Sequence, residues 1–252
     1  MNKQKQIINI IAYLALVIIN YTAVSLPFFG RRPGAVSDLT PTPFTPPDFS
    51  FRIWLFIYIL LGIFIIYQAR DLFDAKKTTP KELSLIGYLF ALSCVFNIGW
   101  LVTWQSLHYV WSFVMIFLLW ACLVRIYIKL AYLKGANWAV VIPFSIYLGW
   151  IAVATLANLN VLLIVADFGF FGLDSIHWSV VMTSIGIFGG LIMLYLNWDI
   201  WFALVIIWTL FGIYTKNNGL PELEIVANTA LIGIVLLIAG IGAATYKIRT
   251  SQ

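Results

Sequence analysis

The chain consists of long apolar runs joined by short polar segments, and this pattern predicts helices that cross a membrane. Repeated runs reach bilayer-spanning length, and they lack the strict alternation of transmembrane β-strands. Because only helices and closed barrels satisfy the backbone in lipid, we expect an all-α, polytopic membrane helical bundle. About eight transmembrane helices are predicted, at residues 7–29, 51–70, 83–104, 109–130, 138–165, 178–195, 200–214 and 223–246.

A proline-rich segment, residues 40–48, lies between the first two predicted spans. It contains Pro41, Pro43, Pro46 and Pro47. Each proline fixes φ, lacks an N–H donor and disfavours helix in the residue before it. We therefore expect this segment to be stiff, with an extended or turned backbone.

The second, third and fifth predicted helices carry aromatic and polar side chains at helical spacing. In the second, Trp54, Tyr58 and Gly62 recur every four residues, which places two hydrogen-bonding aromatic residues and one small residue on one face. In the third, Asn97 and Trp100 share a face. The fifth carries Tyr147, Trp150, Ala154 and Asn158 at intervals of three, four and four.

The composition agrees with a membrane protein and argues against nucleic-acid binding. Hydrophobic residues make up 62% of the 252 positions, which is more apolar surface than a soluble domain can bury. The net charge of +5 does not imply a nucleic-acid partner, because the basic residues lie near the ends of the predicted helices. Cys94 and Cys122 lie in apolar runs without metal-ligand spacing, so packed thiols are expected instead of a metal site.

The distribution of lysine and arginine predicts the orientation in the membrane. With the N-terminus inside, four basic residues fall on the outer side, namely Arg31, Arg32, Arg52 and Lys216. Both termini are therefore expected in the cytoplasm, and the proline-rich segment on the extracytoplasmic side. The inner side has eleven basic residues: Lys3, Lys5, Arg70, Lys76, Lys77, Lys81, Arg125, Lys129, Lys134, Lys247 and Arg249.

The polar and aromatic residues of the spans allow two interpretations. An asparagine in a membrane helix is costly unless it is hydrogen-bonded, so Asn97 and Asn158 are expected to bond another helix, a ligand or water. Helix packing and ligand binding are both open for them. Tryptophans near span ends are expected to anchor the chain at the membrane interface. These are Trp104, Trp111, Trp138 and Trp178.

The order of these motifs resembles the TspO/MBR family, the tryptophan-rich sensory proteins or translocator proteins. The chain has a Pro-Pro-x-aromatic segment, a W-x-x-x-Y-x-x-x-G helix, an N-x-x-W helix and a Y-x-x-W-x-x-x-A-x-x-x-N helix, all within residues 1–165. The residues that correspond to these motifs and that we expect to bind ligand are Pro46, Pro47, Phe49, Trp54, Tyr58, Asn97, Trp100, Tyr147, Trp150, Ala154 and Asn158.

The resemblance implies a five-helix bundle, often dimeric, whose cavity beneath the first loop binds porphyrins, sterols or synthetic isoquinoline-type ligands. It implies porphyrin or haem as a ligand and no required cofactor, and it assigns no catalytic or metal-binding residue. The implied partners are the lipid bilayer, a small hydrophobic ligand and a second copy of the chain in a homodimer. A bacterial plasma membrane is the expected location.

The chain also departs from the family pattern. Phe49 stands where the family has tryptophan, and Ile146 stands where it has proline beside Tyr147, with Pro143 three residues before Ile146. These departures imply a pocket in the same place but with a different shape. The identity of the ligand is therefore not transferred from the family.

Residues 166–252 lie outside the part of the chain on which the resemblance rests. We expect residues 1–165 to form a TspO-like five-helix bundle with a Pro-rich loop at 30–50, and residues 166–252 to add three transmembrane helices packed on the same bundle. Histidines and carboxylates in the connecting loops can in principle hold a metal or haem, although surface positions are favoured. These are His108, Asp167, Asp174 and His177.

Three classes of function fit the sequence. The favoured class is a membrane sensor or carrier that binds a flat hydrophobic ligand, a tetrapyrrole or a sterol-like molecule, with aromatic walls and a few polar groups. The second is an enzyme that degrades a porphyrin or modifies a lipid, but no catalytic acid–base or nucleophile pair lies within the spans. The third is a secondary transporter. Ion-coupled transport usually needs an ionisable residue at mid-membrane, and none is visible in the predicted spans, since Arg125 and Lys129 lie near a helix end.

Overall fold

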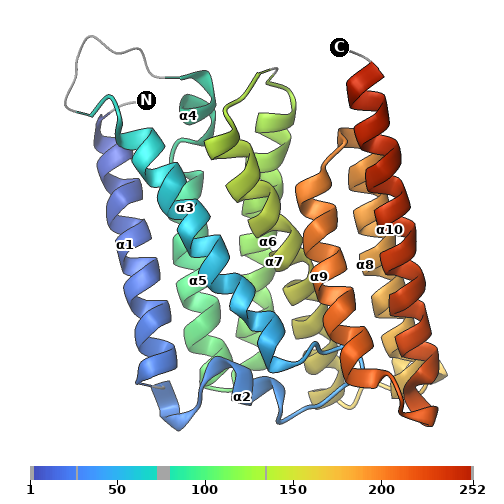
Figure 1. Cartoon of the computed structure of the whole chain (residues 1–252). Coiled ribbons are helices and arrows are strands. Elements are labelled where there is room, and N and C mark those ends of the chain that lie inside the picture. The colour runs from blue at the N-terminus through green and yellow to red at the C-terminus, as the bar shows by residue number, and fades with distance from the viewer. Residues whose placement is uncertain (1–2, 27, 73–79, 134, 251–252) are drawn as a thin grey trace. The chain divides into compact units, whose positions relative to one another are not determined.

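The structure, a computed structural model, describes residues 3–26, 28–72, 80–133 and 135–250 (Figure 1). All regular secondary structure in these ranges is helical, and most of the helices are long and apolar. This confirms the expected all-α, polytopic membrane bundle. Lys76, Lys77 and Lys134, which contributed to the predicted orientation, lie outside the described residues, as does the side chain of Arg249.

Seven helices in the described ranges have the length and composition to cross a membrane. An eighth apolar helix, α5, is shorter at 17 residues, and with it each predicted span corresponds to a helix. The long elements are α1 (Lys3–Ser25), α3 (Ile53–Ala69), α5 (Leu89–Gln105), α6 (Tyr109–Ala131), α7 (Trp138–Val165), α8 (Ser175–Asn197), α9 (Ile200–Asn217) and α10 (Glu224–Thr250). The short ones are η1 (Phe28–Gly30), α2 (Pro33–Ser37), η2 (Asp48–Arg52), α4 (Lys81–Ile86), η3 (Phe170–Gly172) and η4 (Pro221–Leu223).

The third predicted span, residues 83–104, was wrong as a single helix. The chain instead forms α4 and then α5, with Gly87 between them at a φ of 54°. This left-handed backbone suits glycine, which has no Cβ. The amide of Asn9 in α1 donates a hydrogen bond to the Gly87 carbonyl oxygen at 3.1 Å. A neighbouring helix therefore satisfies the backbone at the break.

The first predicted span, residues 7–29, was too long. Helix α1 ends at Ser25, and the chain turns through η1, where Phe29 has a φ of 54°. Pro33 then begins α2, a position that suits proline because the first turn of a helix needs no N–H donor there. The proline-rich segment that follows is turned or extended at residues 40–47, as predicted.

The chain divides into two compact units. The first comprises Met1–Val36 and Ile53–Ile151, and the second comprises Ser37–Arg52 and Ala152–Gln252. Helix α7 thus contributes residues to both units, and the proline-rich segment belongs to the second. The domain division at residue 165 stays a prediction.

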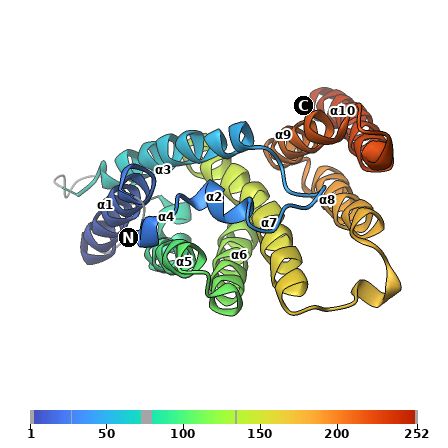
Figure 2. The same cartoon turned by 90° about the horizontal axis from the view of Figure 1, so that it is seen from below.

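In the first unit, α1 packs against α3 and α5, and α5 packs against α6 (Figures 1 and 2). Three phenylalanines from α3, α5 and α7 form part of its core. Phe64 meets Phe90 and Phe144 edge to face, with ring centroids 5.0 and 4.9 Å apart. All three are buried, which holds the helices in register through ring contacts.

In the second unit, α8, α9 and α10 lie side by side in both views (Figures 1 and 2). Two of these helices begin at an aspartate whose side chain accepts a backbone N–H of the first turn. Asp174 accepts from His177 at 2.8 Å, and Asp199 accepts from Phe202 at 3.0 Å. Such caps satisfy donors that a helix leaves unpaired at its start.

Candidate functional site

An aromatic cluster in the first unit contains several of the residues expected to bind ligand. Its centre is Trp54 at the start of α3, whose indole lies nearly parallel to Tyr58 one turn later, with ring centroids 5.6 Å apart and an interplanar angle of 22°. On α5, Trp100 is stacked against the same indole at 5.7 Å and 27°. Trp54 is half-buried, whereas Trp100 is buried.

Two residues of α7 complete this cluster with their ring edges. Tyr147 lies 6.2 Å from Trp54 at an angle of 68°, and Trp150 lies 6.2 Å away at 87°. Both are buried. The structure thus brings five of the expected residues together from three helices, and we call them the Trp54 cluster: Trp54, Tyr58, Trp100, Tyr147 and Trp150.

Asn97 joins the Trp54 cluster to α1 through hydrogen bonds. Its Nδ2 donates to the Tyr147 hydroxyl at 2.9 Å, and its Oδ1 accepts from Nδ2 of Asn20 at 3.1 Å. Asn97 is fully buried, so these bonds satisfy a polar group that is costly to bury alone. In this structure Asn97 links three helices, which is the packing role that the sequence left open for it.

The hydroxyl of Tyr58 is a polar group of the cluster without a hydrogen-bond partner among the described residues. Its Oη is buried and forms no hydrogen bond with any of the described residues. The backbone of Tyr58 is held instead, since the Tyr13 hydroxyl donates to its carbonyl oxygen at 2.9 Å. Gly62 makes room for this contact, because a Cβ there would lie 2.7 Å from the Tyr13 oxygen. The Tyr58 hydroxyl therefore remains available as a donor.

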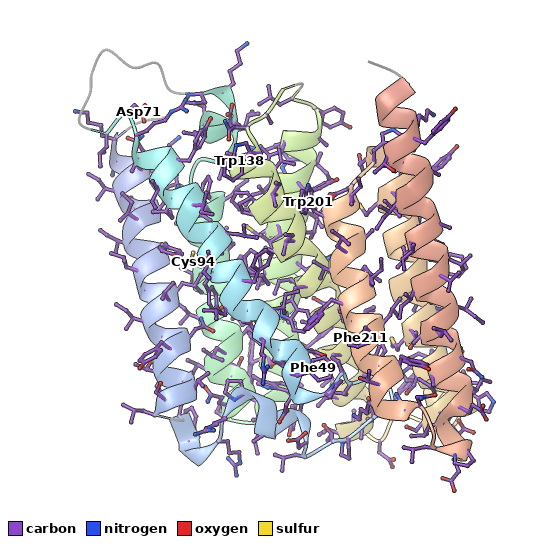
Figure 3. All side chains as sticks on the ribbon, in the orientation of Figure 1. Phe49, Asp71, Cys94, Trp138, Trp201 and Phe211 are labelled. Carbon is purple, nitrogen blue, oxygen red and sulfur yellow. The ribbon has the colours of Figure 1, made fainter. Side chains whose placement is uncertain are left out.

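The expected loop residues Pro46, Pro47 and Phe49 lie in the second unit, where they contact α9. The ring of Phe49 meets Trp208 edge on, with centroids 5.6 Å apart, and Phe211 at 6.2 Å. Figure 3 shows Phe49 and Phe211 beside one another. These three residues are thus grouped with α9, a helix that the sequence did not connect with the loop.

The remaining expected residues, Ala154 and Asn158, lie in the part of α7 that belongs to the second unit. Asn158 is 5% exposed, and its Nδ2 donates to the Ala154 carbonyl oxygen at 2.9 Å. This bond lies within one helix, so it connects the two expected residues with each other. A role for either in ligand binding stays a prediction.

A comparison with protein families identifies the chain. The family described as TSPO-like protein matches residues 6–243, which is nearly the whole sequence. The chain belongs to the TSPO-like protein family. Comparisons with curated proteins and with solved structures found no match.

The family match of this TSPO-like protein extends past residue 165 and includes α8, α9 and most of α10. The resemblance described from the sequence rested on motifs in the first five predicted spans. The match continues to residue 243, so it is not confined to the first five predicted spans.

Trp104 was wrongly predicted to anchor this TSPO-like protein at the membrane interface. It is 5% exposed, and its Nε1 donates to the Pro33 carbonyl oxygen at 3.0 Å. Gln105 beside it donates to the Ala23 carbonyl oxygen at 3.2 Å. These side chains fix the turn after α1. Trp111 and Trp138 are exposed, as an interfacial anchor would be.

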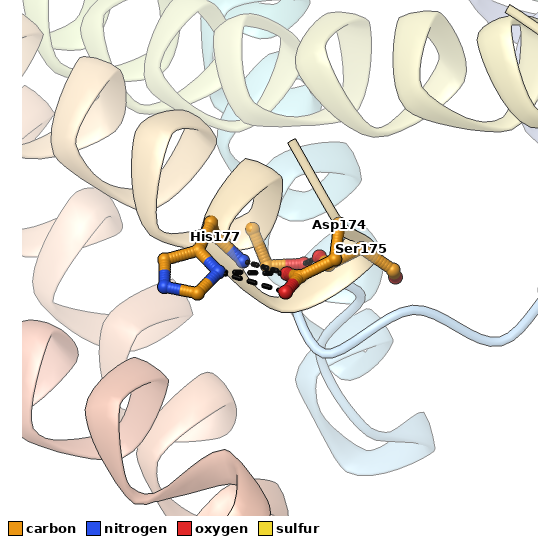
Figure 4. Close-up of polar contacts among 4 residues, drawn as sticks. Asp174, Ser175 and His177 are labelled. Atoms are coloured by element: carbon orange, nitrogen blue, oxygen red, sulfur yellow. Dashed lines mark hydrogen bonds and ion pairs between the residues drawn. The ribbon is translucent and has the colours of Figure 1, made fainter. Parts of the chain in front are cut away.

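The histidines and carboxylates of the connecting loops form small local contacts. His177 lies 2.9 Å from the carboxylate of Asp174 through Nδ1, and both side chains are exposed (Figure 4). The backbone N–H and the ring of His177 hold the pKa of Asp174 below its ordinary value. Asp174 thus caps the start of α8, and both residues lie at the surface, as the sequence favoured. His108 pairs with Ser106 at 2.8 Å.

Sequence reasoning missed several residues that the structure connects to the expected site. Asn20 and Tyr13 of α1 bond to residues of the Trp54 cluster or its neighbour Asn97. On α9, Trp208, Lys216 and Asn217 bond to the proline-rich segment. One signal was available for α9, because Trp208, Gly212 and Lys216 are spaced four apart and so share a face.

Proposed function

We propose that this TSPO-like membrane protein binds a flat hydrophobic ligand, a tetrapyrrole or a sterol-like molecule, at the Trp54 cluster. The proposal is supported by the stack of Tyr58, Trp54 and Trp100, whose nearly parallel rings suit a planar molecule. Binding sites for small molecules are mostly apolar with a few placed polar groups. The cluster has this character.

The single observation that carries the proposal is the buried hydroxyl of Tyr58. It lacks a hydrogen-bond partner among the described residues and lies beside the half-buried indole of Trp54. A buried donor without a partner costs about 1–3 kcal/mol, so a ligand with an acceptor group would recover that free energy. An aromatic face and an unused donor together favour a planar ligand that carries a polar edge.

The proposal is tested by titrating the purified protein in detergent with haem, protoporphyrin or cholesterol and recording tryptophan fluorescence. We expect saturable quenching by the tetrapyrroles, with the ligand's absorption spectrum unchanged after release. Trp54→Leu should weaken the apparent affinity about tenfold, because it removes the central ring of the stack. Tyr58→Phe should weaken it by a smaller factor, because it removes only the hydroxyl.

Trp138→Leu is the matched control for this titration, since Trp138 is 61% exposed and lies outside the Trp54 cluster. It should bind as the parent protein does. Quenching that keeps its affinity in Trp54→Leu would contradict the proposed site. A ligand that returns with an altered absorption spectrum would instead favour the enzyme class, and ligand flux into liposomes would favour the transporter class.

We also propose that both termini face the cytoplasm of a bacterial cell and that the proline-rich segment faces outward. Asp48 and Ser84 are exposed and lie on segments predicted to face opposite sides. A membrane-impermeant maleimide should label Asp48→Cys in intact cells, whereas Ser84→Cys should react only after permeabilisation. Labelling of Ser84→Cys in intact cells would reverse the proposed orientation.

A further inference from the structure

The proline-rich segment has more backbone acceptors than donors. Residues 40–50, which we call the proline loop, contain four prolines that carry a carbonyl group but no N–H group. Two backbone hydrogen bonds form within the loop itself. The Thr45 N–H donates to the Thr42 carbonyl oxygen at 3.1 Å, and the Ser50 N–H donates to the Pro47 carbonyl oxygen at 2.9 Å. Thr42, Thr45 and Ser50 are buried, and buried carbonyls need donors. The donors must come from another part of the chain.

Helix α9 supplies donors from its last turn. The ammonium group of Lys216 donates to the carbonyl oxygens of Thr42 and Thr45 at 3.1 and 2.9 Å. The next residue, Asn217, donates from Nδ2 to the Pro43 carbonyl oxygen at 2.8 Å. Two adjacent side chains thus satisfy three carbonyl groups of the proline loop. The bonds from Lys216 are charge-assisted, which makes them stronger than bonds between neutral groups.

Two further contacts hold the other end of the proline loop on the same helix. Nε1 of Trp208 donates to the Ser50 carbonyl oxygen at 3.0 Å, and its ring packs against Phe49. Gly212 lies between this contact and Lys216. A Cβ on Gly212 would lie 3.2 Å from both Pro46 and Pro47, so the glycine lets the loop rest directly on the helix.

The residues of α9 that contact the proline loop lie on one face of the helix. Trp208, Gly212 and Lys216 follow one another at intervals of four, and the loop lies along them. The hydrogen bonds described for Lys216 go to backbone carbonyls of the loop, and the charge of Asp38, just before the loop, also acts on Lys216. Lys216 therefore gains these partners only while the proline loop rests on α9, and it exchanges them for water when the loop leaves.

We propose that Lys216 and Asn217 of α9 act as a latch, by which we mean that their hydrogen bonds hold the proline loop against α9. In the closed state the loop rests on this helix, and loss of these donors lets the loop leave it, which is the open state. The inference does not depend on the identity of any ligand. It gives α9 a conformational role. The helix would hold a segment far from it in the sequence, since Lys216 and Thr42 are 174 residues apart.

Ser50→Cys provides a probe of loop opening in the full-length protein. Ser50 is fully buried, and its Oγ has no hydrogen-bond partner among the described residues, so a thiol there keeps the existing bonds. We expect a membrane-impermeant maleimide to label this cysteine slowly while the loop is closed. Adding Lys216→Met should raise the labelling rate about tenfold, because two charge-assisted bonds are lost.

Three variants make the outcome decisive. Lys216→Arg keeps the donors and should raise the labelling rate less than Lys216→Met. Lys247→Met is the control, because it removes a lysine that lies over the Trp198 ring, and it should leave the labelling rate unchanged. Trp208→Phe keeps an aromatic ring but loses the bond to Ser50, so it should raise the rate even where Lys216→Met does not fold. Unchanged labelling in the folded Lys216→Met and Trp208→Phe proteins would overturn the latch.

Discussion

Replacing Asn97 with leucine is expected to lower the free energy of unfolding by about 2–4 kcal/mol, because it removes two hydrogen bonds and leaves the buried Tyr147 hydroxyl without its donor. Asn97 is fully buried and connects Asn20 to Tyr147 at 3.1 and 2.9 Å. Leucine has a similar volume, so the loss comes mainly from the hydrogen bonds. The measurement is equilibrium unfolding in mixed micelles, followed by circular dichroism.

A double-mutant cycle separates the bond to Tyr147 from other effects of the change. Tyr147→Phe removes only the hydroxyl that accepts from Asn97. If the bond is formed, Tyr147→Phe should cost much less in the Asn97→Leu background than in the parent. Asn197→Leu is the control, since Asn197 is exposed and its described contact is a weak one to Met193 at 3.8 Å. Equal stability of Asn97→Leu and the parent would refute the three-helix link.

The helical class and the approximate positions of the spans follow directly from the sequence. Lipid permits no unsatisfied backbone, so an apolar run of sufficient length has essentially one structure available to it. This is why each predicted span overlaps a long helix of the structure, although the third also includes part of the short helix α4. The turned backbone of the proline loop was predictable for a local reason, because proline restricts its own φ and the residue before it.

The errors in the predicted spans have a tertiary cause. A glycine within an apolar run is compatible with a helix, and nothing near Gly87 in the sequence marks a break. The break is hydrogen-bonded by Asn9, a residue 78 positions away. Similarly, Trp104 resembled an interfacial anchor, but its indole bonds to Pro33, which lies 71 positions earlier. Local patterns cannot report partners at such distances.

The candidate site could be predicted only in part, because local spacing shows which residues share a helix face but not which distant residues they contact. The spacing of Trp54, Tyr58 and Gly62 predicted a shared face, and the stacking of Trp54 on Tyr58 confirms it. What the face would meet could not be deduced, because Tyr13 reaches Gly62 from another helix. The proline loop posed a larger problem, since its partners on α9 are separated from it by 158–174 residues.

Replacing Gly212 with valine is expected to lower the free energy of unfolding by about 2–3 kcal/mol, because the added atoms have no space. A Cβ at this position would lie 2.4 Å from the Ser50 oxygen and 3.2 Å from both Pro46 and Pro47. A serine side chain can rotate, but proline rings are rigid and cannot give way. We therefore expect the proline loop to shift away from α9, which would also weaken the bonds from Lys216 to its carbonyl groups.

The measurement combines unfolding with hydrogen–deuterium exchange of residues 37–52, where faster exchange in Gly212→Val would report release of the loop. Gly186→Val is the matched control, because a Cβ on Gly186 would meet no atom within 4 Å although it also lies in a long apolar helix. Both substitutions change helix propensity alike, so only the difference between them measures the contact with the loop. If the two variants unfold and exchange alike, the proline loop does not rest on α9.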